Sequence, residues 1–231
     1  MTGSPEPVVR CTNVARTYGA GRAAVVAVHG VCCEVNAGER IAIVGPSGSG
    51  KSTLLHLMAG LDVPTTGVIS WPALGDRSAL RPRLVGVVFQ GPSLLAPLDV
   101  EENIALPLVL GGADPGLAAE AARITLARVG LDDVSSALPE ELSGGQAQRV
   151  AIARVLAARH RLILADEPTG QLDHVTGAHV MDALLETASE TGAALVVSTH
   201  DPAVAERLTR QWQIADGKLV GADRQDASCS A

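Results

Sequence analysis

Short runs of apolar residues, three to five residues long, recur along the chain and predict buried strands. They are Ile41 to Val44, Val85 to Phe89, Leu162 to Ala165 and Leu195 to Val197. Short runs without a polar residue are typical of strands in a parallel sheet whose two faces are both buried. Residues 8 to 35 instead alternate between apolar and polar positions, which predicts strands with one buried face.

Helical patterns lie between these strands. Apolar residues recur at helical spacing from Asp173 to Ser189, which predicts an amphipathic helix. A shorter helix is predicted from Ser52 to Ala59, with Gly60 ending it. Asp114-Pro115 is a typical N-cap and first helical residue, and it predicts a helix through Leu117 to Val129. Strands that alternate with helices in this way favour an α/β fold.

The pattern also divides the chain into a core and an inserted lobe. It is helical between Gly91 and Leu142, whereas strands are predicted on both sides of that segment. A hairpin about Asp216-Gly217 is expected within Gln211 to Val220. We therefore expect a single domain in which residues 8–90 and 142–220 form the core, residues 91–141 form a helical lobe, and residues 221–231 are disordered.

Composition narrows the classes of function. A chain of 231 residues with 47% hydrophobic content suits one α/β domain, and its net charge of −7 argues against nucleic-acid binding. The N-terminus lacks a signal-sequence pattern, and the uncharged apolar run Asn103 to Ala113 has 11 residues where a membrane span needs about 20. A cytoplasmic protein is expected. The four cysteines lack metal-site spacing, and the adjacent Cys32 and Cys33 are predicted to point to opposite faces of a strand.

A glycine-rich loop, Gly45-Pro46-Ser47-Gly48-Ser49-Gly50-Lys51-Ser52, joins the strand at Ile41 to Val44 to the following helix. Strand, loop and helix in this order form the context of a phosphate-binding loop. Its backbone N–H groups are expected to surround the α and β phosphates, Lys51 to reach the β and γ phosphates, and the Ser52 hydroxyl to ligate Mg²⁺. A chance glycine turn is the alternative, and it would not require this flanking pattern.

Two acids end the buried strand that precedes Pro168. Asp166 can hold Mg²⁺ directly or through water, and Glu167 can polarise the water that attacks a γ phosphate. The alternative is that both acids simply begin a helix, where carboxylates are favourable. Because Pro168 disfavours continuation of the strand, Glu167 is expected to lie outside the sheet.

Three further residues occupy positions that suit a nucleotide site. His200 follows the strand at Leu195 to Val197 and can donate a hydrogen bond to the γ phosphate. Gln90 follows another buried strand and can contact Mg²⁺ or the attacking water. Tyr18, the sole tyrosine, lies in a loop bounded by glycine, which favours a stacking platform for a nucleobase over a core residue. Taken singly, His200 favours a structural role, and a polar residue such as Gln90 is common at the end of a strand.

A second glycine turn lies within Glu141 to Arg149 and resembles half of a phosphate site. Ser143 can cap a helix, and Gly144 and Gly145 would let backbone N–H groups approach an anion closely. This turn lacks a lysine. On its own pattern it is an incomplete site.

Together these motifs resemble the nucleotide-binding subunit of ATP-binding cassette (ABC) transporters over nearly the whole chain, from about Val8 to Val220. The resemblance implies a P-loop NTPase with a RecA-like core, an antiparallel β lobe and an inserted helical lobe. Leu54 to Asp62, Glu102 to Pro107 and Ala165 to Asp173 are similar to the branch that includes lipoprotein-release and macrolide-export ATPases.

The resemblance also assigns a role to each motif. The implied catalytic residues are Glu167, His200, Lys51 and Gln90. The implied nucleotide-binding residues are Tyr18, Gly45, Pro46, Ser47, Gly48, Ser49, Gly50, Lys51, Ser52 and Thr53. The implied Mg²⁺ ligands are Ser52, Gln90 and Asp166. The implied signature is Leu142, Ser143, Gly144, Gly145 and Gln146, and Asp173 belongs to the D-loop within Gln171-Leu172-Asp173.

In this family two subunits pack head to tail, which implies that the signature of one chain completes the ATP site of the other. We therefore expect a homodimer that binds two Mg·ATP, hydrolyses ATP, and energises an integral membrane permease from the inner face of the membrane, in a transporter of the export or mechanotransmission type. Leu94, Leu95, Leu98 and Val100 are candidates for permease contact, and core packing of the lobe is the equal alternative. A soluble ABC ATPase that acts as a regulatory or assembly switch is the alternative function.

Overall fold

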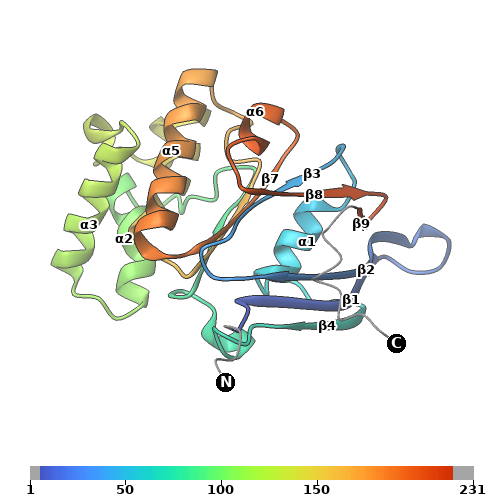
Figure 1. Cartoon of the computed structure of the whole chain (residues 1–231). Coiled ribbons are helices and arrows are strands. Elements are labelled where there is room, and N and C mark those ends of the chain that lie inside the picture. Colours follow the sequence, from blue (N-terminus) through green and yellow to red (C-terminus); the bar gives the residue numbers. More distant parts are fainter. Residues whose placement is uncertain (1–5, 221–231) are drawn as a thin grey trace. The chain divides into compact units, whose positions relative to one another are not determined.

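The computed structural model describes residues 6–220 and has the α/β architecture expected from the sequence (Figure 1). The chain forms two compact units, Met1–Leu80 with Ala194–Ala231, and Arg81–Ala193. The predicted lobe of residues 91–141 falls within the second unit, and its bounds stay a prediction. The predicted disordered tail, residues 221–231, lies outside the described residues.

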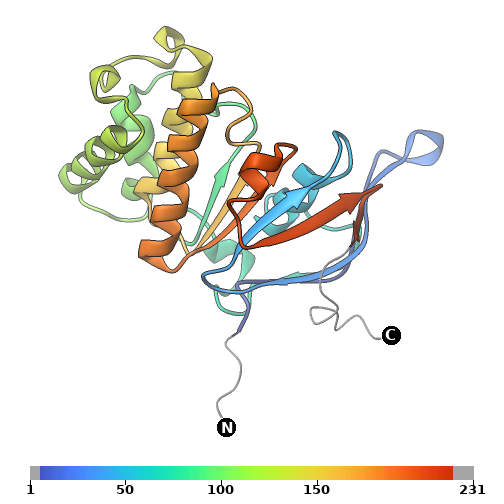
Figure 2. The ribbon, with the colours of Figure 1, turned by 45° about the horizontal axis from the view of Figure 1, so that its top comes forward.

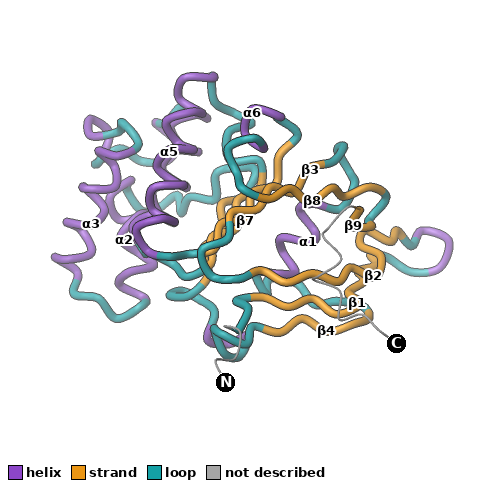
Figure 3. The backbone as a smooth tube through the Cα atoms, in the orientation of Figure 1, coloured by secondary structure: helices purple, strands orange, loops and turns teal. Residues whose placement is uncertain are grey.

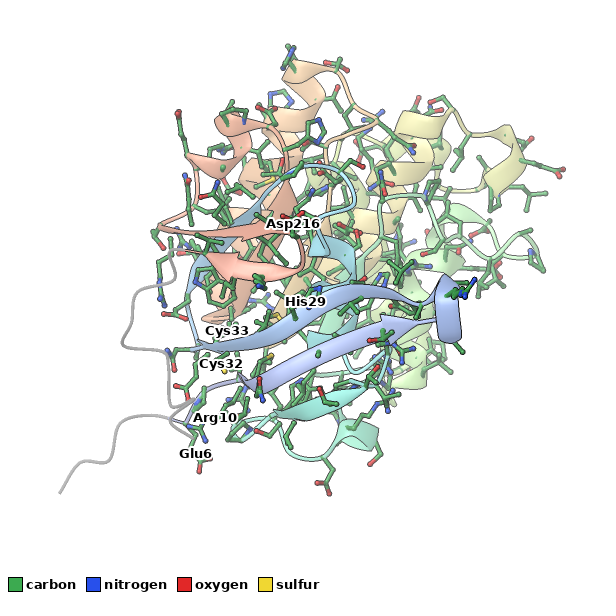
Figure 4. The ribbon with its side chains drawn as sticks, turned by 90° about the vertical axis from the view of Figure 1, so that its right-hand side faces the viewer. Glu6, Arg10, His29, Cys32, Cys33 and Asp216 are labelled. Atoms are coloured by element: carbon green, nitrogen blue, oxygen red, sulfur yellow. The ribbon has the colours of Figure 1, made fainter. Side chains whose placement is uncertain are left out.

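The first unit contains an antiparallel sheet with the strand order β2-β1-β4 (Figure 3). Its strands are β1 (Val9–Tyr18), β2 (Val25–Val35) and β4 (Thr66–Ser70), and a 3-10 helix, Gly21–Ala23, separates β1 from β2. Cys33 is buried and Cys32 is half-buried on β2, in agreement with the prediction that adjacent cysteines point to opposite faces (Figure 4).

The same unit contains the strand order β7-β3-β8-β9. Here β3 (Arg40–Val44) pairs in parallel with β7 (Ala194–Thr199) and β8 (Arg210–Ala215), and β9 (Lys218–Val220) closes an antiparallel hairpin. β3 and β7 are the apolar runs predicted as buried strands. Helix α1 (Lys51–Met58) contacts β7, β1 and β2, and the short helix α6 (Pro202–Ala205) contacts β7 and β3.

The hairpin turn confirms the prediction made from Asp216-Gly217. Both residues have positive φ, 48° and 73°, which is the conformation that a two-residue type I′ turn requires. Figure 4 shows His29 of β2 close to this turn, and the His29 backbone N–H donates to the Gly217 carbonyl at 2.8 Å. The hairpin is therefore tied to the antiparallel sheet.

The second unit combines two parallel strands with four α-helices. β5 (Val85–Val88) pairs with β6 (Leu162–Asp166), and the helices are α2 (Val100–Leu110), α3 (Pro115–Arg128), α4 (Gly144–Ala157) and α5 (His174–Thr191). Helix α4 contacts the three other helices and β5 (Figure 2). Asp114 caps α3 as predicted, accepting from the backbone N–H groups of Gly116 and Leu117 at 2.9 and 3.2 Å.

In this second unit, the His160 ring packs against Gly86, where there is no side chain. His160 is buried, burial lowers the pKa of its imidazole, and its Nδ1 lies 3.1 Å from the Arg83 carbonyl oxygen. A Cβ atom added at Gly86 would lie 2.2 Å from His160 Cδ2, well inside van der Waals contact. The imidazole occupies the space that a side chain on β5 would need.

We expect Gly86→Ala to lower the free energy of unfolding by about 1–3 kcal/mol, because the added methyl group overpacks a buried site. Denaturant unfolding measures this change. Adding His160→Ala should recover part of the loss, since it removes the clashing ring. Gly91→Ala is the control, because a Cβ there meets no atom of the described residues within 4 Å. Equal stability of the two single variants would contradict the packing argument.

Candidate functional site

The glycine-rich loop lies between β3 and α1 in the first unit and already encloses its lysine. Lys51 Nζ donates to the carbonyl oxygens of Gly45 and Pro46 at 2.8 and 3.0 Å, and Lys51 is only 7% exposed. The ammonium therefore lies inside the turn, at the N-terminus of α1. Backbone N–H groups, the positive end of a helix dipole and a cation converge there, an arrangement that binds anions.

Two glycines of the loop are required by close contacts with other elements. A Cβ atom at Gly45 would lie 2.2 Å from the Ile214 carbonyl oxygen of β8, and one at Gly50 would lie 2.2 Å from the Ala27 carbonyl oxygen of β2. Gly50 also has φ of 104°, which disfavours any other residue. The loop is thus held between the two sheets of the first unit, and any side chain at Gly45 or Gly50 would displace it.

The hydroxyl residues of the loop differ in exposure. Ser47 is exposed, Ser49 is buried, and Ser52 and Thr53 are half-buried in the first turn of α1. Ser49 Oγ has no hydrogen-bond partner among the described residues. The Ser52 hydroxyl is placed at the helix N-terminus, where an oxygen ligand of a phosphate-bound cation is expected.

His200 follows the end of β7 at the same edge of the parallel sheet where the glycine loop follows the end of β3. Val44, the last residue of β3, is paired in register with Thr199, the last residue of β7, so Gly45 and His200 are the next residues along two adjacent strands. His200 is exposed. The Asp201 backbone N–H donates to Thr199 Oγ1 at 3.0 Å and fixes the backbone around the histidine.

Tyr18 ends β1 and is 40% exposed, so it is not a core residue. Its hydroxyl donates to Asp62 Oδ2 at 2.9 Å. The Arg16 guanidinium carbon lies 4.6 Å from the centre of its ring. Sequence reasoning missed both neighbours. Arg16 was detectable, because residues two apart on a strand share a face, whereas Asp62 is distant in the chain and left no signal.

In the second unit, Gln90 and Glu167 also leave adjacent strands at one level. Val88 is paired with Ala165 in the parallel register of β5 and β6, so Phe89 and Asp166 follow together, and Gln90 and Glu167 come next. Asp166 is 4% exposed, whereas Gln90 is exposed and Glu167 is half-buried. The register therefore brings an amide and a carboxylate to one edge.

Glu167 has the left-handed backbone conformation, with φ of 46°. This is uncommon for a residue that has a side chain, and such strain concentrates at functional sites. The Gly170 N–H donates to the Glu167 carbonyl at 3.1 Å, closing a turn directly after the sheet. The prediction that Glu167 lies outside the sheet is correct, but its positive φ was not predictable from Pro168.

The second glycine turn forms the N-terminus of α4. Ser143 is the N-cap: its Oγ accepts from the Gln146 N–H at 3.2 Å, and the Gln146 side chain accepts from the Ser143 N–H at 2.9 Å. Gly144 and Gly145 occupy the first two helical positions, and the preceding Leu142 is half-buried. The first-turn N–H groups of both glycines have no acceptor within the helix, an arrangement that favours an anion, although this turn has no lysine.

The D-loop contacts this turn within the same unit. A Cβ at Gly145 would lie 3.4 Å from Leu172 Cδ2, and one at Gly144 would lie 3.7 Å from Gln171 Oε1. Asp173 caps α5, and hydrogen bonds from Thr176 lower the pKa of its carboxyl group. Asp173 therefore remains ionised at neutral pH.

Of the residues considered for permease contact, Val100 is fully buried, so for this residue that expectation is wrong. Val100 is the first residue of α2, and its side chain belongs to the core. Leu95 is 46% exposed, and Leu94 and Leu98 are half-buried. The buried Asn103 holds this loop through its side-chain amide, which bonds to the backbone of Leu95, Leu98 and Asp99.

The sequence profile of the ABC transporter family matches residues 28–170, which is more than half of the chain. The chain belongs to this family. It is an ATP-binding and ATP-hydrolysing cassette, as the motif resemblance implied. No helix within residues 6–220 combines the length and the hydrophobicity that crossing a membrane requires.

Similar proteins span nearly the whole chain of this ABC ATPase. The lipoprotein-releasing system ATP-binding protein LolD 2 of Rhodospirillum rubrum is 42% identical over 95% of this chain and 99% of its own length. LolD of Pseudomonas syringae pv. tomato is 41% identical over 95% of this chain and its full length. An uncharacterized ABC transporter ATP-binding protein of Mycobacterium tuberculosis is 39% identical over 94% of this chain and 90% of its own.

Solved ABC structures have the same fold. The dimeric structure of MJ0796, a bacterial ABC transporter cassette, has a TM-score of 0.85 and 37% identity, over 91% of this chain and 96% of that one. A second dimeric MJ0796 structure, in a post-hydrolysis state bound to ADP and Pi, has a TM-score of 0.84 with the same identity and coverage. These similarities confirm the predicted fold class and the ATPase assignment.

Proposed function

We propose that this chain is the ATPase subunit of a transporter of the lipoprotein-releasing type, which forms a homodimer around two Mg·ATP and drives an integral membrane permease. The main observation is that two proteins named as ATP-binding subunits of lipoprotein-releasing systems align over 99% and 100% of their lengths at about 40% identity. In this role the chain is a cytoplasmic protein held at the inner face of the membrane by the permease.

We assign the first unit's loop to the triphosphate. Gly45 to Thr53 surround the phosphates through backbone N–H groups and hydroxyls, and Lys51 stabilises the charge on the β and γ phosphates. Lys51 exchanges its bonds with the Gly45 and Pro46 carbonyls for bonds with phosphate oxygens, so little reorganisation is needed. Tyr18 provides a stacking surface for the base.

The proposed Mg²⁺ ligands fit the ion by chemistry. Ser52, Asp166 and Gln90 offer a hydroxyl, a carboxylate and an amide oxygen, which are the hard donors that Mg²⁺ prefers. Asp166 is held rigidly as the buried last residue of β6. When bound, Mg²⁺ neutralises charge on the β and γ phosphate oxygens.

Hydrolysis is assigned to residues at the carboxyl ends of the parallel strands. Glu167 accepts a proton from the attacking water, and Gln90, which leaves the adjacent strand at the same level, orients that water through its amide. His200 donates a hydrogen bond to the γ phosphate and so distinguishes ATP from ADP. Each of these side chains lies one or two residues beyond the end of a strand, where the sheet fixes its backbone.

The signature is assigned to the second copy's nucleotide. Ser143 Oγ accepts from Gln146, which leaves its hydroxyl proton available to a phosphate oxygen. The N–H groups of Gly144 and Gly145 point from the same helix terminus. ATP that contacts both chains stabilises only the closed dimer, so binding shifts the population toward closure, and hydrolysis releases it.

Purification of the tagged chain from membranes in mild detergent tests the permease assignment. We expect an integral membrane protein to co-purify in fixed stoichiometry. Leu95→Asp should weaken this association at least about tenfold, because it charges an exposed apolar side chain at the candidate contact. Leu117→Asp is the control, since Leu117 is 65% exposed on α3.

The soluble-switch alternative predicts a different result in the same experiment. Recovery of the chain with a soluble assembly, such as a cell-division complex, and without a membrane protein would overturn the permease assignment. The ATPase assignment would be unaffected.

A further inference from the structure

Arg16, Tyr18 and Asp62 form a closed cluster at the end of β1. Asp62 Oδ2 accepts two hydrogen bonds, from Arg16 Nε at 2.8 Å and from the Tyr18 hydroxyl at 2.9 Å. The guanidinium of Arg16 in turn lies over the Tyr18 ring, 4.6 Å from its centre. Each of the three side chains therefore contacts the other two.

The carboxylate at the centre of this cluster is held from both sides. Asp62 Oδ1 accepts from the Val63 N–H at 2.7 Å, so each of its oxygens is engaged. Partial burial raises the pKa of Asp62, but the Val63 N–H, the Tyr18 hydroxyl and the Arg16 guanidinium together lower it below its usual value. Asp62 is a carboxylate at neutral pH, and charge-assisted hydrogen bonds are the stronger kind.

The backbone supports the same arrangement. The Thr17 N–H donates to Thr65 Oγ1 at 2.9 Å, and the Thr65 N–H donates to the Ala15 carbonyl at 2.8 Å. The segment that carries Asp62 is thus fixed to β1 beside Tyr18. The Arg16 and Asp62 side chains are only 23% and 21% exposed, whereas Tyr18 is 40% exposed.

Tyr18 stays 40% exposed within the cluster. Arg16 lies over one face of its ring, and the hydroxyl at the ring's edge is committed to Asp62, so the exposed surface is assigned to the other face. A planar ligand can therefore stack on Tyr18 from a single side, and it meets a ring whose tilt and position are already set. Preorganisation of this kind lowers the entropy cost of binding.

We propose that Arg16 and Asp62 are positioning residues that hold Tyr18 as a one-sided platform for the nucleobase of ATP. This inference rests on the proposed role of Tyr18 in the nucleotide site. Arg16 and Asp62 act through the tyrosine and do not contact ATP themselves. Their contribution belongs to ATP binding and leaves the chemistry at the γ phosphate unchanged.

Steady-state kinetics with Asp62→Ala and Arg16→Met test the proposal. We expect KM for ATP to rise about 3- to 10-fold in each variant, the size of one lost hydrogen bond or ring contact, while kcat at saturating ATP changes less than about twofold. Asp62→Asn should recover part of the effect, because its amide oxygen still accepts a hydrogen bond from Tyr18. Inhibition by tripolyphosphate, which has no base, should be unchanged.

Glu34→Ala is the matched control. It removes the Arg10–Glu34 ion pair, which joins β1 to β2 in the same sheet as Tyr18 but does not contact it. If the cluster served only to stabilise β1, its loss would lower the free energy of unfolding and leave KM for ATP equal to that of Glu34→Ala. Equal KM values, or an equal loss of tripolyphosphate binding, would overturn the proposal.

The sole tyrosine gives a direct spectroscopic readout. In protein labelled with ring-¹³C tyrosine, ATP should shift the Tyr18 signals through the ring current of the stacked base, and Asp62→Ala should reduce that shift. Tyr18→Ala and Lys51→Ala distinguish a failure of the Tyr18 platform from a failure of the proposed nucleotide site. If Tyr18→Ala leaves KM unchanged while Lys51→Ala abolishes ATP binding, the platform is wrong and the ATPase site stands. If Lys51→Ala also binds ATP normally, the proposed nucleotide site itself is wrong.

Discussion

Glu167→Gln is expected to lower ATP hydrolysis by at least about 10²-fold while retaining an ATP-dependent dimer, because the amide cannot take a proton from the attacking water. The substitution keeps the shape of the side chain, so binding of Mg·ATP and closure of the dimer are preserved. Size-exclusion chromatography should then give a doubled mass with ATP and a monomer with ADP.

The backbone conformation at Glu167 supports the expectation that Glu167→Gln keeps the local structure. Glu167 has φ of 46°, and backbone atoms close its turn, since the Gly170 N–H donates to the Glu167 carbonyl oxygen. Glutamine should adopt the same conformation. Glu186→Gln, an exposed position on α5, is the control for a change of one charge. A persistent monomer at saturating ATP would count against the two-site dimer.

Local chemistry explains which parts of the fold were predictable from the sequence. The glycine loop between β3 and α1, the Asp216-Gly217 hairpin and the Asp114 cap each depend on residues that are close in the chain. Turn and cap residues act on their own backbone, so their positions identify the elements directly.

Contacts between distant residues were not predictable in the same way. Gly86 accommodates His160, and Asp62 holds Tyr18, although the partners are far apart in the sequence. Nothing in a single sequence states which side chains meet across a fold. Val100 shows the same limit, since an apolar residue at the start of a helix suits either a core or an interface, and only the packing decides.

The candidate site was predictable only in part, because it depends both on local motifs and on the pairing of distant strands. The sequence placed His200, Gln90 and Glu167 after buried strands, and parallel pairing then brings strand ends to a common level. The pairing register of the strands adds the spatial information that the sequence motifs alone do not contain. Val44 with Thr199 and Val88 with Ala165 fix which residues leave the sheet side by side.

Gly145→Asp is expected to abolish dimer closure and to lower ATP hydrolysis at least about 10²-fold, with monomeric ATP binding unchanged. Gly145 is the second residue of α4, and a Cβ there would make only an ordinary contact, 3.4 Å from Leu172 Cδ2. A carboxylate in the first turn is favourable for a helix, so the fold should be kept. In the proposed dimer, the same charge would repel the γ phosphate of the partner's ATP. Isothermal titration measures ATP binding, size exclusion measures dimer formation, phosphate release measures hydrolysis, and thermal unfolding checks that the fold is kept.

Gly116→Asp is the control for adding a carboxylate to the first turn of a helix, because Gly116 is the second residue of α3 and lies outside the proposed signature. A Cβ there would lie 3.1 Å from Asp114 Oδ1, so its thermal unfolding is compared separately. Mixing two inactive variants then tests whether the site is shared between chains. A heterodimer of Gly145→Asp with Lys51→Ala contains one composite site that keeps both Lys51 and Gly145, while the other site carries both changes. Mixed samples should therefore recover ATP-dependent dimers and hydrolysis well above the sum of the separate variants. If the signature instead served the ATP bound to its own chain, every site in the mixture would be defective and no recovery would occur.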